Sequence, residues 1–419
     1  MSTSIRVLSS LTLVSLLFFA CGGSSSSDAV DPRVAFAGAG GAGGANGSWG
    51  DISPGTGIPT EFVPGGGGTP TPPPPAIRYP EFLVLTNDGG NVMSLGIDDI
   101  GGLNFISSYD DGVSRPIYSA KHPSRDYIYT ADFGTGALRA YSVNKTTGEL
   151  SLIGTEIEGQ NNPTAIVLST NGDFLYLSNQ ATGTSLSTLT TFSVGANGGL
   201  TQLGVPQVAS GLYYGLSFSP DGNYLYGITQ QSGRVDIFRA DPITGALESE
   251  GDVTTAGGRP FKIGFSLDGT LAFVSYGDVS FVSIYSYDAS SGALEPVGSI
   301  PTAEASYRFT LHPTRPLIYV TTYQGNIQLF SYDASGGSAP IGSTVGLGGL
   351  SGDLAFNRNA NYAYYTDYFS DTLYSFEVAA DGTLTALADY GPEDFPGLDP
   401  WEPYNVVSNN NVVTKRRPE

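Results

Sequence analysis

A repeated phrase constrains the fold of this chain more than any other feature, and it is clearest between Phe218 and Glu248. Apolar and polar residues alternate around Leu225 and again around Val235, which is the period of a half-buried β-strand. Ser219-Pro220-Asp221-Gly222 and Thr244-Gly245 punctuate these runs, because Asp-Gly and Thr-Gly tolerate or supply the positive φ of a hairpin corner. The stretch therefore predicts three strands joined by two tight turns.

Seven copies of this unit follow one another. Their first turns begin at residues 122, 169, 219, 266, 312, 357 and 408, so the spacings are 47, 50, 47, 46, 45 and 51 residues. A period in this range with about four short strands per unit is typical of a β-propeller. The 57 Gly and many aromatic residues suit such a turn-rich chain. We expect an all-β fold, a seven-bladed β-propeller with four-stranded blades.

The ends of the repeat region predict how the ring closes. The unit that starts at Ile77 lacks its first strand and turn, and the missing strand recurs at the other end as Tyr404–Ser408. Pairing the two closes the ring and hides both sheet edges. The propeller is expected to span residues 77–414, with residues 415–419 as a tail.

The N-terminal segment indicates secretion. Residues 1–20 carry Arg6 and then an apolar run that ends at Ala20, immediately before Cys21, which is typical of a signal peptide. Leu17–Cys21 resembles a bacterial lipoprotein lipobox, with Phe18 where Leu is usual. By that resemblance Cys21 is lipidated and anchors the chain in the membrane, and Gly22 points to the outer membrane. Ordinary signal-peptidase cleavage beside a bystander Cys is the alternative.

Residues 21–76 comprise that Cys and a Gly/Ser/Pro-rich linker, which has too few apolar side chains to form a core. Gly38, Gly40 and Gly43 match the spacing of a dinucleotide-binding fingerprint, but they lie in low-complexity sequence, so we expect no cofactor. The net charge of −21 argues against a nucleic-acid partner. A single Cys excludes an internal disulfide framework and a Cys-based zinc site, and we expect no metal.

Two registers of the repeat are expected to reach one mouth of the central channel. One is the residue just after the second strand of each unit, which is polar or phenolic in every copy: Asn87, Asp132, Asn179, Thr229, Tyr276, Thr322 and Asp367. These residues either line the mouth or make local turns, since Asn, Asp and Thr do both.

The other register leads into the first strand of each unit and holds Arg115, Arg259, Lys262 and Arg308, four of only 18 basic residues. Cations converging on one mouth suit a ligand with a carboxylate or phosphate group. Alternatively they pair with nearby carboxylates and only balance the channel. The candidate binding residues are Arg115, Arg259, Lys262, Tyr307, Arg308, Asp132, Asn179, Asp367 and Glu402.

The only two histidines, His122 and His312, occupy the slot that Ser219 fills in its own copy. That slot lies in the turn between the first two strands, away from the expected mouth, so we interpret both as structural. The catalytic residues remain unknown, because the chain contains no nucleophile elbow, HExxH motif or phosphate loop.

The repeats resemble the lactonase family of seven-bladed propellers, which includes propeller-type 6-phosphogluconolactonases. The likeness covers roughly residues 80–414 and rests on the phrases S-P-D-G-x-x-L-Y, at 219–226, and Y-x-x-D-x-x-T-G-x-L, around 238–247. Where the family tends to have G-P-H, this chain has Gly258–Lys262. Where it has A-E-I and S-N-R-G, this chain has Ala305-Ser306-Tyr307 and Thr321–Gln324.

These departures leave three functions open. We expect a lipid-anchored envelope protein that binds a small anionic or sugar-like ligand, or an envelope protein, through the channel mouth. The alternative is a sugar-lactone hydrolase with an Asp or Glu base and the mouth cations at the oxyanion. A structural surface protein whose rim contacts other envelope proteins is the third.

Overall fold

The structure is a computed structural model that describes residues 78–87, 90–109, 112, 114–180, 187–348, 351–367, 370–395 and 403–408, the last six and residue 351 without their side chains. The chain divides into two compact units, Met1–Pro72 and Pro73–Glu419, and the described residues all belong to the second. The expected signal peptide, Cys21, the linker and Glu402 lie outside them.

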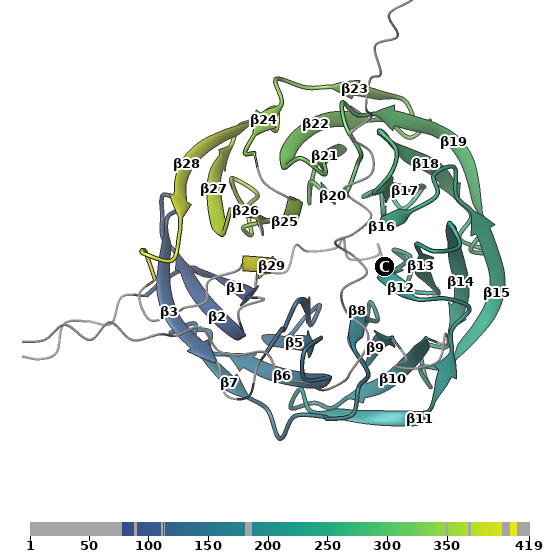
Figure 1. The fold of residues 1–419 in the computed structure, drawn as a ribbon, viewed down its shortest axis with the longest axis horizontal. Coiled ribbons are helices and arrows are strands. Elements are labelled where there is room, and N and C mark those ends of the chain that lie inside the picture. The colour runs from purple at the N-terminus through teal and green to yellow at the C-terminus, as the bar shows by residue number, and fades with distance from the viewer. Residues whose placement is uncertain are drawn as a thin grey trace, which may run out of the picture. The chain divides into compact units, whose positions relative to one another are not determined.

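Every regular element of the described part is a β-strand, and the strands form seven antiparallel blades around an axis (Figure 1). The strands of each blade are given from the innermost outward. Blade 1 comprises β29 (Pro403–Ser408), β1 (Glu81–Asn87), β2 (Asn91–Ile97) and β3 (Leu103–Tyr109), and blade 2 comprises β4 (Tyr118–Lys121), β5 (Tyr127–Asp132), β6 (Ala137–Val143) and β7 (Leu150–Leu152). Blade 3 comprises β8 (Pro163–Leu168), β9 (Phe174–Asn179), β10 (Thr188–Val194) and β11 (Leu200–Val208), and blade 4 comprises β12 (Tyr213–Phe218), β13 (Tyr224–Thr229), β14 (Arg234–Ala240) and β15 (Leu247–Thr254).

Blades 5 to 7 comprise β16 (Pro260–Phe265), β17 (Leu271–Tyr276), β18 (Phe281–Tyr287) and β19 (Leu294–Pro301); β20 (Arg308–Leu311), β21 (Leu317–Thr321), β22 (Asn326–Tyr332) and β23 (Ser338–Pro340); and β25 (Ser351–Phe356), β26 (Tyr362–Asp367), β27 (Thr372–Val378) and β28 (Leu384–Tyr390). The short β24 (Val345–Gly346) also pairs with β22 in blade 6. The predicted all-β, seven-bladed propeller is confirmed.

The predicted ring closure is present in blade 1. Strand β29 pairs antiparallel with β1, so that Leu83 lies opposite Ser408 and Thr86 opposite Asn405. The last described strand of the chain thereby becomes the innermost strand of the first blade, and neither strand leaves its edge open there.

The core lies between neighbouring blades, because each blade presents one apolar face to the next. Between blades 4 and 5, for example, Tyr226 and Ile228 of β13 pack in one buried cluster with Ile263 of β16 and Val274 of β17. Large buried side chains facing each other across the blades supply most of the stabilising burial.

A repeated tyrosine hydrogen bond joins successive blades. Tyr226 donates from its hydroxyl to the carbonyl oxygen of Gly292 at 2.7 Å, and burial raises the pKa of this phenol far above its usual value. The same bond runs from Tyr129 to Gly198, Tyr176 to Gly245, Tyr319 to Gly382 and Tyr364 to Gly101. The Tyr of the phrase S-P-D-G-x-x-L-Y therefore holds the Gly of the phrase T-G-x-L in the following copy.

The two histidines hold turns on the face opposite the expected mouth. His122 accepts hydrogen bonds at Nδ1 from the backbone N–H groups of Ser124 and Arg125, both at 3.1 Å. In equivalent turns the hydroxyl of Ser219 accepts from the N–H of Tyr224, and the amide oxygen of Asn357 accepts from that of Tyr362, both at 3.0 Å. The position requires a hydrogen-bond acceptor, which His, Ser and Asn all provide.

Candidate functional site

The two registers predicted from the sequence meet at one end of the blades. Residues at the start of the innermost strand lie opposite residues at the end of the second strand, as the pairs Pro163 with Asn179, Tyr213 with Thr229, Pro260 with Tyr276 and Ser351 with Asp367 show. The turns that hold the histidines lie at the other end of the same strands.

Asp132, from the first register, is buried and bonded within its own blade. Its carboxylate accepts hydrogen bonds from the N–H groups of Ser114 and Arg115, at 2.8 and 2.9 Å, and pairs with Arg139 at 3.2 Å. Burial raises the pKa of Asp132, but these N–H groups and Arg139 outweigh it and hold the pKa below its usual value. The arrangement secures the turn between β5 and β6.

Other members of this register also bond locally. The Asn179 amide donates to Gln160 at 3.2 Å and to Thr190 at 3.1 Å, and the Thr322 hydroxyl donates to Glu304 at 2.6 Å. Asp367 is fully buried and accepts a hydrogen bond from the N–H of Ser370 at 3.3 Å. Gln160 and Glu304 lie in the loops before the innermost strands, so their bonds run across the mouth end of the blades rather than within a single turn.

Three charged side chains converge on consecutive inner strands. Lys262 on β16 lies 3.8 Å from Asp353 on β25, and Arg308 on β20 lies 2.8 Å from the other oxygen of the same carboxylate. Lys262 faces Ser275 and Arg308 faces Thr321 across the sheet, while the N–H of Asp353 donates to the Thr366 hydroxyl at 3.0 Å.

Ser275, Thr321 and Thr366 each come directly before a member of the first register, namely Tyr276, Thr322 and Asp367. The three charges therefore stand at one level of the inner ring, in blades 5, 6 and 7. We define Lys262, Arg308 and Asp353 as the mouth triad.

The environment of Lys262 disfavours its positive charge. Burial lowers the pKa of the amine and Arg308 lowers it further, whereas Asp353 acts in the opposite direction without restoring it. The amine also lies 5.8 Å from the centre of the Phe309 ring. The side chain still has 38% of its surface exposed, so a solute reaches it.

Aromatic rings lie beside the triad. Tyr307 packs on Phe261 at 4.2 Å between ring centres and edge-on against Tyr323 at 5.5 Å, and the Arg308 guanidinium lies 5.5 Å from the Tyr307 ring. These side chains are half-buried, so part of each ring faces solvent.

Arg259 is exposed on the loop before β16, and among the described residues its guanidinium makes no hydrogen bond or ion pair. It lies near Tyr214, whose pKa burial raises while Arg259 opposes the rise. Arg115 lies elsewhere on the ring, before β4 in blade 2, with its guanidinium 5.2 Å from the centre of the Phe133 ring. The structure thus brings Arg259, Lys262, Tyr307 and Arg308 together on blades 5 and 6 and places Arg115 apart.

Asp353 was missed from the sequence, although a signal was present. Blade 7 enters its innermost strand through Ser351-Gly352-Asp353, without the Arg, Tyr or Pro that marks this register in other copies. Aligning the inner strands by the residues they face, rather than by similar phrases, places Asp353 level with Lys262 and Arg308.

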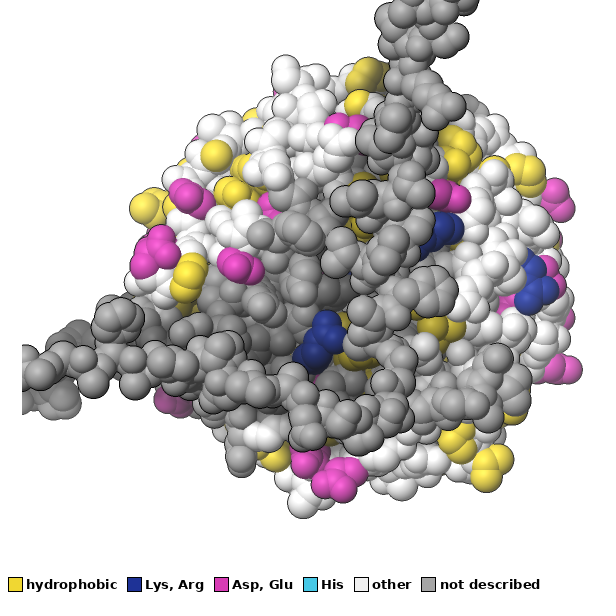
Figure 2. Space-filling view, in the orientation of Figure 1, with side chains coloured by type: hydrophobic (Ala, Val, Ile, Leu, Met, Phe, Trp, Pro, Cys, Tyr) yellow, Lys and Arg dark blue, Asp and Glu magenta, His cyan; other side chains and the backbone are white. Residues whose placement is uncertain are grey.

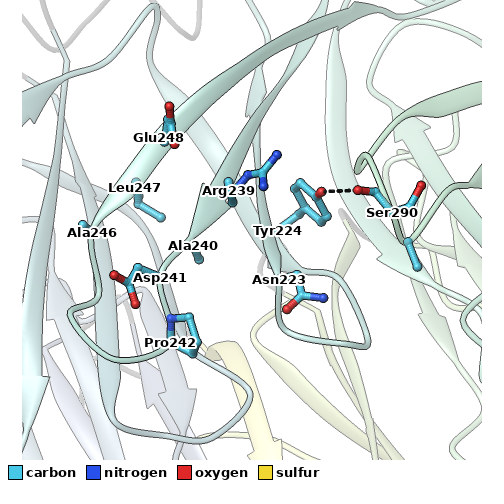
Figure 3. A pocket seen from close by; sticks show the side chains of 11 residues that line it. Asn223, Tyr224, Arg239, Ala240, Asp241, Pro242, Ala246, Leu247, Glu248 and Ser290 are labelled. Atoms are coloured by element: carbon cyan, nitrogen blue, oxygen red, sulfur yellow. Dashed lines mark hydrogen bonds between the residues drawn. The ribbon is translucent and has the colours of Figure 1, made fainter.

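A hollow lies on the face opposite the mouth, between the turns of blades 4 and 5 (Figure 3). It has a volume of about 600 Å³. Two of its polar side chains already have partners: Tyr224 donates to the carbonyl oxygen of Ser290 at 3.0 Å, and Arg239 pairs with Glu250 at 2.5 Å. We place the candidate site at the mouth, where the exposed guanidinium of Arg259, which has no partner among the described residues, stands beside the triad.

On the face seen in Figure 2, Asp and Glu side chains lie mainly around the rim, whereas Lys or Arg side chains lie both at the rim and near the centre. Within the described part, no three His, Cys, Asp or Glu side chains gather as metal ligands do. No helix there is long and apolar enough to cross a membrane.

Comparison with known proteins supports the architecture. A family described as "Lactonase, 7-bladed beta-propeller" matches residues 145–265. The chain resembles lactonase-type propellers. No curated protein sequence matches it significantly.

This chain aligns with nearly the whole length of several solved structures of lactonase-like propellers. A periplasmic gluconolactonase of Pseudomonas aeruginosa aligns with a TM-score of 0.67 and 19% identity, over 78% of this chain and 98% of that one. A putative 6-phosphogluconolactonase of Bacteroides fragilis aligns with a TM-score of 0.66 and 18% identity, over 78% and 98%. At such low sequence identities the likeness shows the fold alone.

Proposed function

We propose that this lactonase-like propeller is a cell-envelope binding protein that holds a small anionic, sugar-like ligand at its mouth. The observation that carries the proposal is the mouth triad, with two cations and a carboxylate at one level of three consecutive inner strands. Arg259 stands beside it as a further cation, and its guanidinium has no partner within the described residues.

The chemistry of these groups fits a sugar acid. A guanidinium binds carboxylate or phosphate oxygens through paired N–H donors, which suits Arg259. The Asp353 carboxylate accepts hydrogen bonds from sugar hydroxyls, and the exposed part of the Tyr307 ring supplies an apolar surface for the face of a sugar. Binding sites for small ligands combine a few polar groups with aromatic walls in this way.

Calorimetric titration of the purified chain with gluconate and with 6-phosphogluconate tests this proposal. Arg259→Ala is expected to weaken binding about tenfold, which corresponds to about 1.4 kcal/mol. Arg239→Ala is the matched control, because Arg239 is an exposed guanidinium on β14, paired with Glu250 away from the mouth. Absence of binding of either compound at millimolar concentration, or equal weakening by both variants, would overturn the proposal.

A second candidate is hydrolysis of a sugar lactone, favoured by the position of Asp353 between two cations. A carboxylate can accept a proton from the attacking water, and neighbouring cations stabilise the oxyanion that forms on the lactone carbonyl. Arg308 already holds the Asp353 carboxylate at 2.8 Å, which is why binding is the first candidate. The test is to measure hydrolysis of δ-gluconolactone by the wild type, Asp353→Asn and Arg259→Ala. If the wild type shows no turnover above background, the hydrolase hypothesis is rejected.

Attachment to the outer membrane through a lipidated Cys21 belongs to the same proposal. It is supported by the apolar run before Cys21 and by the Gly/Ser/Pro-rich linker that follows it. A linker of about 55 residues lets the propeller sample a distance on the order of 40 Å from its anchor.

A further inference from the structure

We infer that Lys262 is a reactive amine that forms a reversible imine with small carbonyl compounds bearing an acid group, such as 2-oxo acids. The inference deepens the proposed function and rests on it for recognition of the acid group. The reactivity of the amine itself rests on the mouth triad alone.

The contacts of Lys262 leave its amine weakly compensated. Its carboxylate neighbour, Asp353, lies 3.8 Å away, beyond ordinary hydrogen-bond length, while Arg308 holds that carboxylate at 2.8 Å. On its other neighbour strand, β20, the amine meets the Phe309 ring and the like charge of Arg308.

Such surroundings favour the neutral amine. The pKa of Lys262 is lowered by burial and by Arg308, against the pull of Asp353. A neutral lysine amine is a nucleophile, whereas the ammonium ion is not, and lysines that are desolvated beside another cation are the ones that form imines with carbonyl substrates. The exposed part of the Lys262 side chain admits the carbonyl compound.

The step balances without any further reactant. Neutral Nζ adds to the carbonyl carbon to give a carbinolamine, which loses one molecule of water to leave a carbon–nitrogen double bond. Solvent water takes a proton from the nitrogen and returns one to the departing hydroxyl, while the Asp353 carboxylate, 3.8 Å away, stabilises the positive charge that forms on the nitrogen. Arg259, on the loop before the same strand, attracts the acid group of the ligand.

The chain carries its own controls, since it has four lysines, Lys121, Lys145, Lys262 and Lys415. Lys145 is 78% exposed and pairs with Asp126 at 2.9 Å, which raises its pKa. Burial lowers the pKa of Lys121 to about 8, but Lys121 ends β4 at the histidine-bearing face, away from the mouth. Lys121 is therefore the control for a lysine that has a lowered pKa but lies outside the mouth.

The test is reductive trapping on the full chain. The protein is treated at pH 7.5 with limiting glyoxylate and cyanoborohydride, or with formaldehyde and cyanoborohydride, and each lysine is quantified by peptide mass spectrometry. With formaldehyde, which has no acid group, we expect Lys262 to be modified about tenfold faster than Lys145. With glyoxylate the ratio of Lys262 to Lys121 should rise several-fold, and Arg259→Ala should abolish that rise while leaving formaldehyde modification unchanged.

The outcomes separate this inference from the proposed function. Modification of Lys262 no faster than Lys145 by either reagent overturns the inference, even where calorimetry shows gluconate binding. Preferential modification by formaldehyde without the gain from glyoxylate overturns the acid-bearing ligand class and counts against the anion site as well. Lys262→Arg must remove the signal at position 262 and leave that at Lys121 intact, which confirms the assignment of the peptide.

Discussion

The Tyr226 hydroxyl donates a hydrogen bond of 2.7 Å to the carbonyl oxygen of Gly292, which lies 66 residues further along the chain in the next blade. Both groups are buried, so no water replaces either partner. Five such bonds join successive blades in the described residues. In each, the Tyr of the first repeated phrase donates to the Gly of the second repeated phrase in the next blade.

Removing that hydroxyl is expected to destabilise the ring measurably. Tyr226→Phe leaves the buried Gly292 carbonyl without a donor and should lower the free energy of unfolding by about 1–2 kcal/mol. Tyr127→Phe is the control, because the Tyr127 hydroxyl bonds to the Ala196 carbonyl at 3.1 Å in an exposed place where water replaces it. Urea unfolding of both variants checks this, and equal losses would contradict it.

The turn glycine that accepts such a bond is expected to be intolerant of a side chain. Gly245 has a φ of +72°, and a Cβ there would lie 2.5 Å from the Phe174 ring of the neighbouring blade. Gly154 has a similar φ of +69° with nothing within 4 Å of its Cβ. Gly154→Ala should therefore cost about 1 kcal/mol from backbone strain alone, and Gly245→Ala about 3 kcal/mol.

Thermal or urea unfolding measures that difference. If the two alanine variants lose the same stability, the contact between the turn and the neighbouring ring does not contribute, and strain alone explains the glycine.

His312 is expected to make stability depend on pH in the acidic range. Burial, and then the Arg315 guanidinium 3.0 Å from its Nε2, lower the pKa of His312 from 6.5 to about 4. The folded state thus binds this proton less readily than the unfolded state. The stabilising contribution is complete above pH 6.5 and is lost as the pH falls from 6.5 to about 4, by an amount on the order of 3 kcal/mol.

Asn is the matched replacement for His312, because Asn357 fills the equivalent position in blade 7 and also accepts a hydrogen bond there from a backbone N–H group, that of Tyr362. His312→Asn should keep the turn and flatten the dependence of the unfolding free energy between pH 6.5 and pH 4. Part of the slope will remain, since burial lowers the pKa of His122 as well. Urea unfolding at half-unit pH steps checks it, and an unchanged slope would show that His312 does not titrate in this range.

Cys21→Ala is expected to release the protein from membranes. Loss of the acylated residue leaves no lipid anchor, so the variant should fractionate with soluble proteins while the wild type sediments with membranes. Ser24→Ala, in the same linker, is the control and should remain with the membrane. A Cys21→Ala variant that still sediments would show that another part of the chain makes the attachment.

The fold was predictable because its signals are local and repeated. Asp221-Gly222 and Thr244-Gly245 mark corners that only certain residues allow, and their recurrence reveals the period. The missing strand of the first unit predicted its closure by Tyr404–Ser408, and the pairing of β29 with β1 confirms it.

The site was predictable only in part, because a register shows which residues share a level and not which of them bond elsewhere. Arg259, Lys262 and Arg308 were found by the rarity of basic residues in this acidic chain. Asp353 was not, since its strand begins without the usual phrase. The Asp132 carboxylate is already bonded to the N–H of Ser114 and to Arg139. Such pairing depends on the directions of side chains, which the spacing of residues in the sequence does not reveal.

The pairing of β29 with β1 has a consequence for biosynthesis. Until Pro403–Ser408 has left the ribosome, β1 has no partner on its inner side and blade 1 exists as three strands. A ring built this way is completed only after all of its other blades have been synthesised, so until then blade 1 keeps an open inner edge. A premature stop just before Pro403 would therefore leave every other strand of the ring in place and the ring itself open.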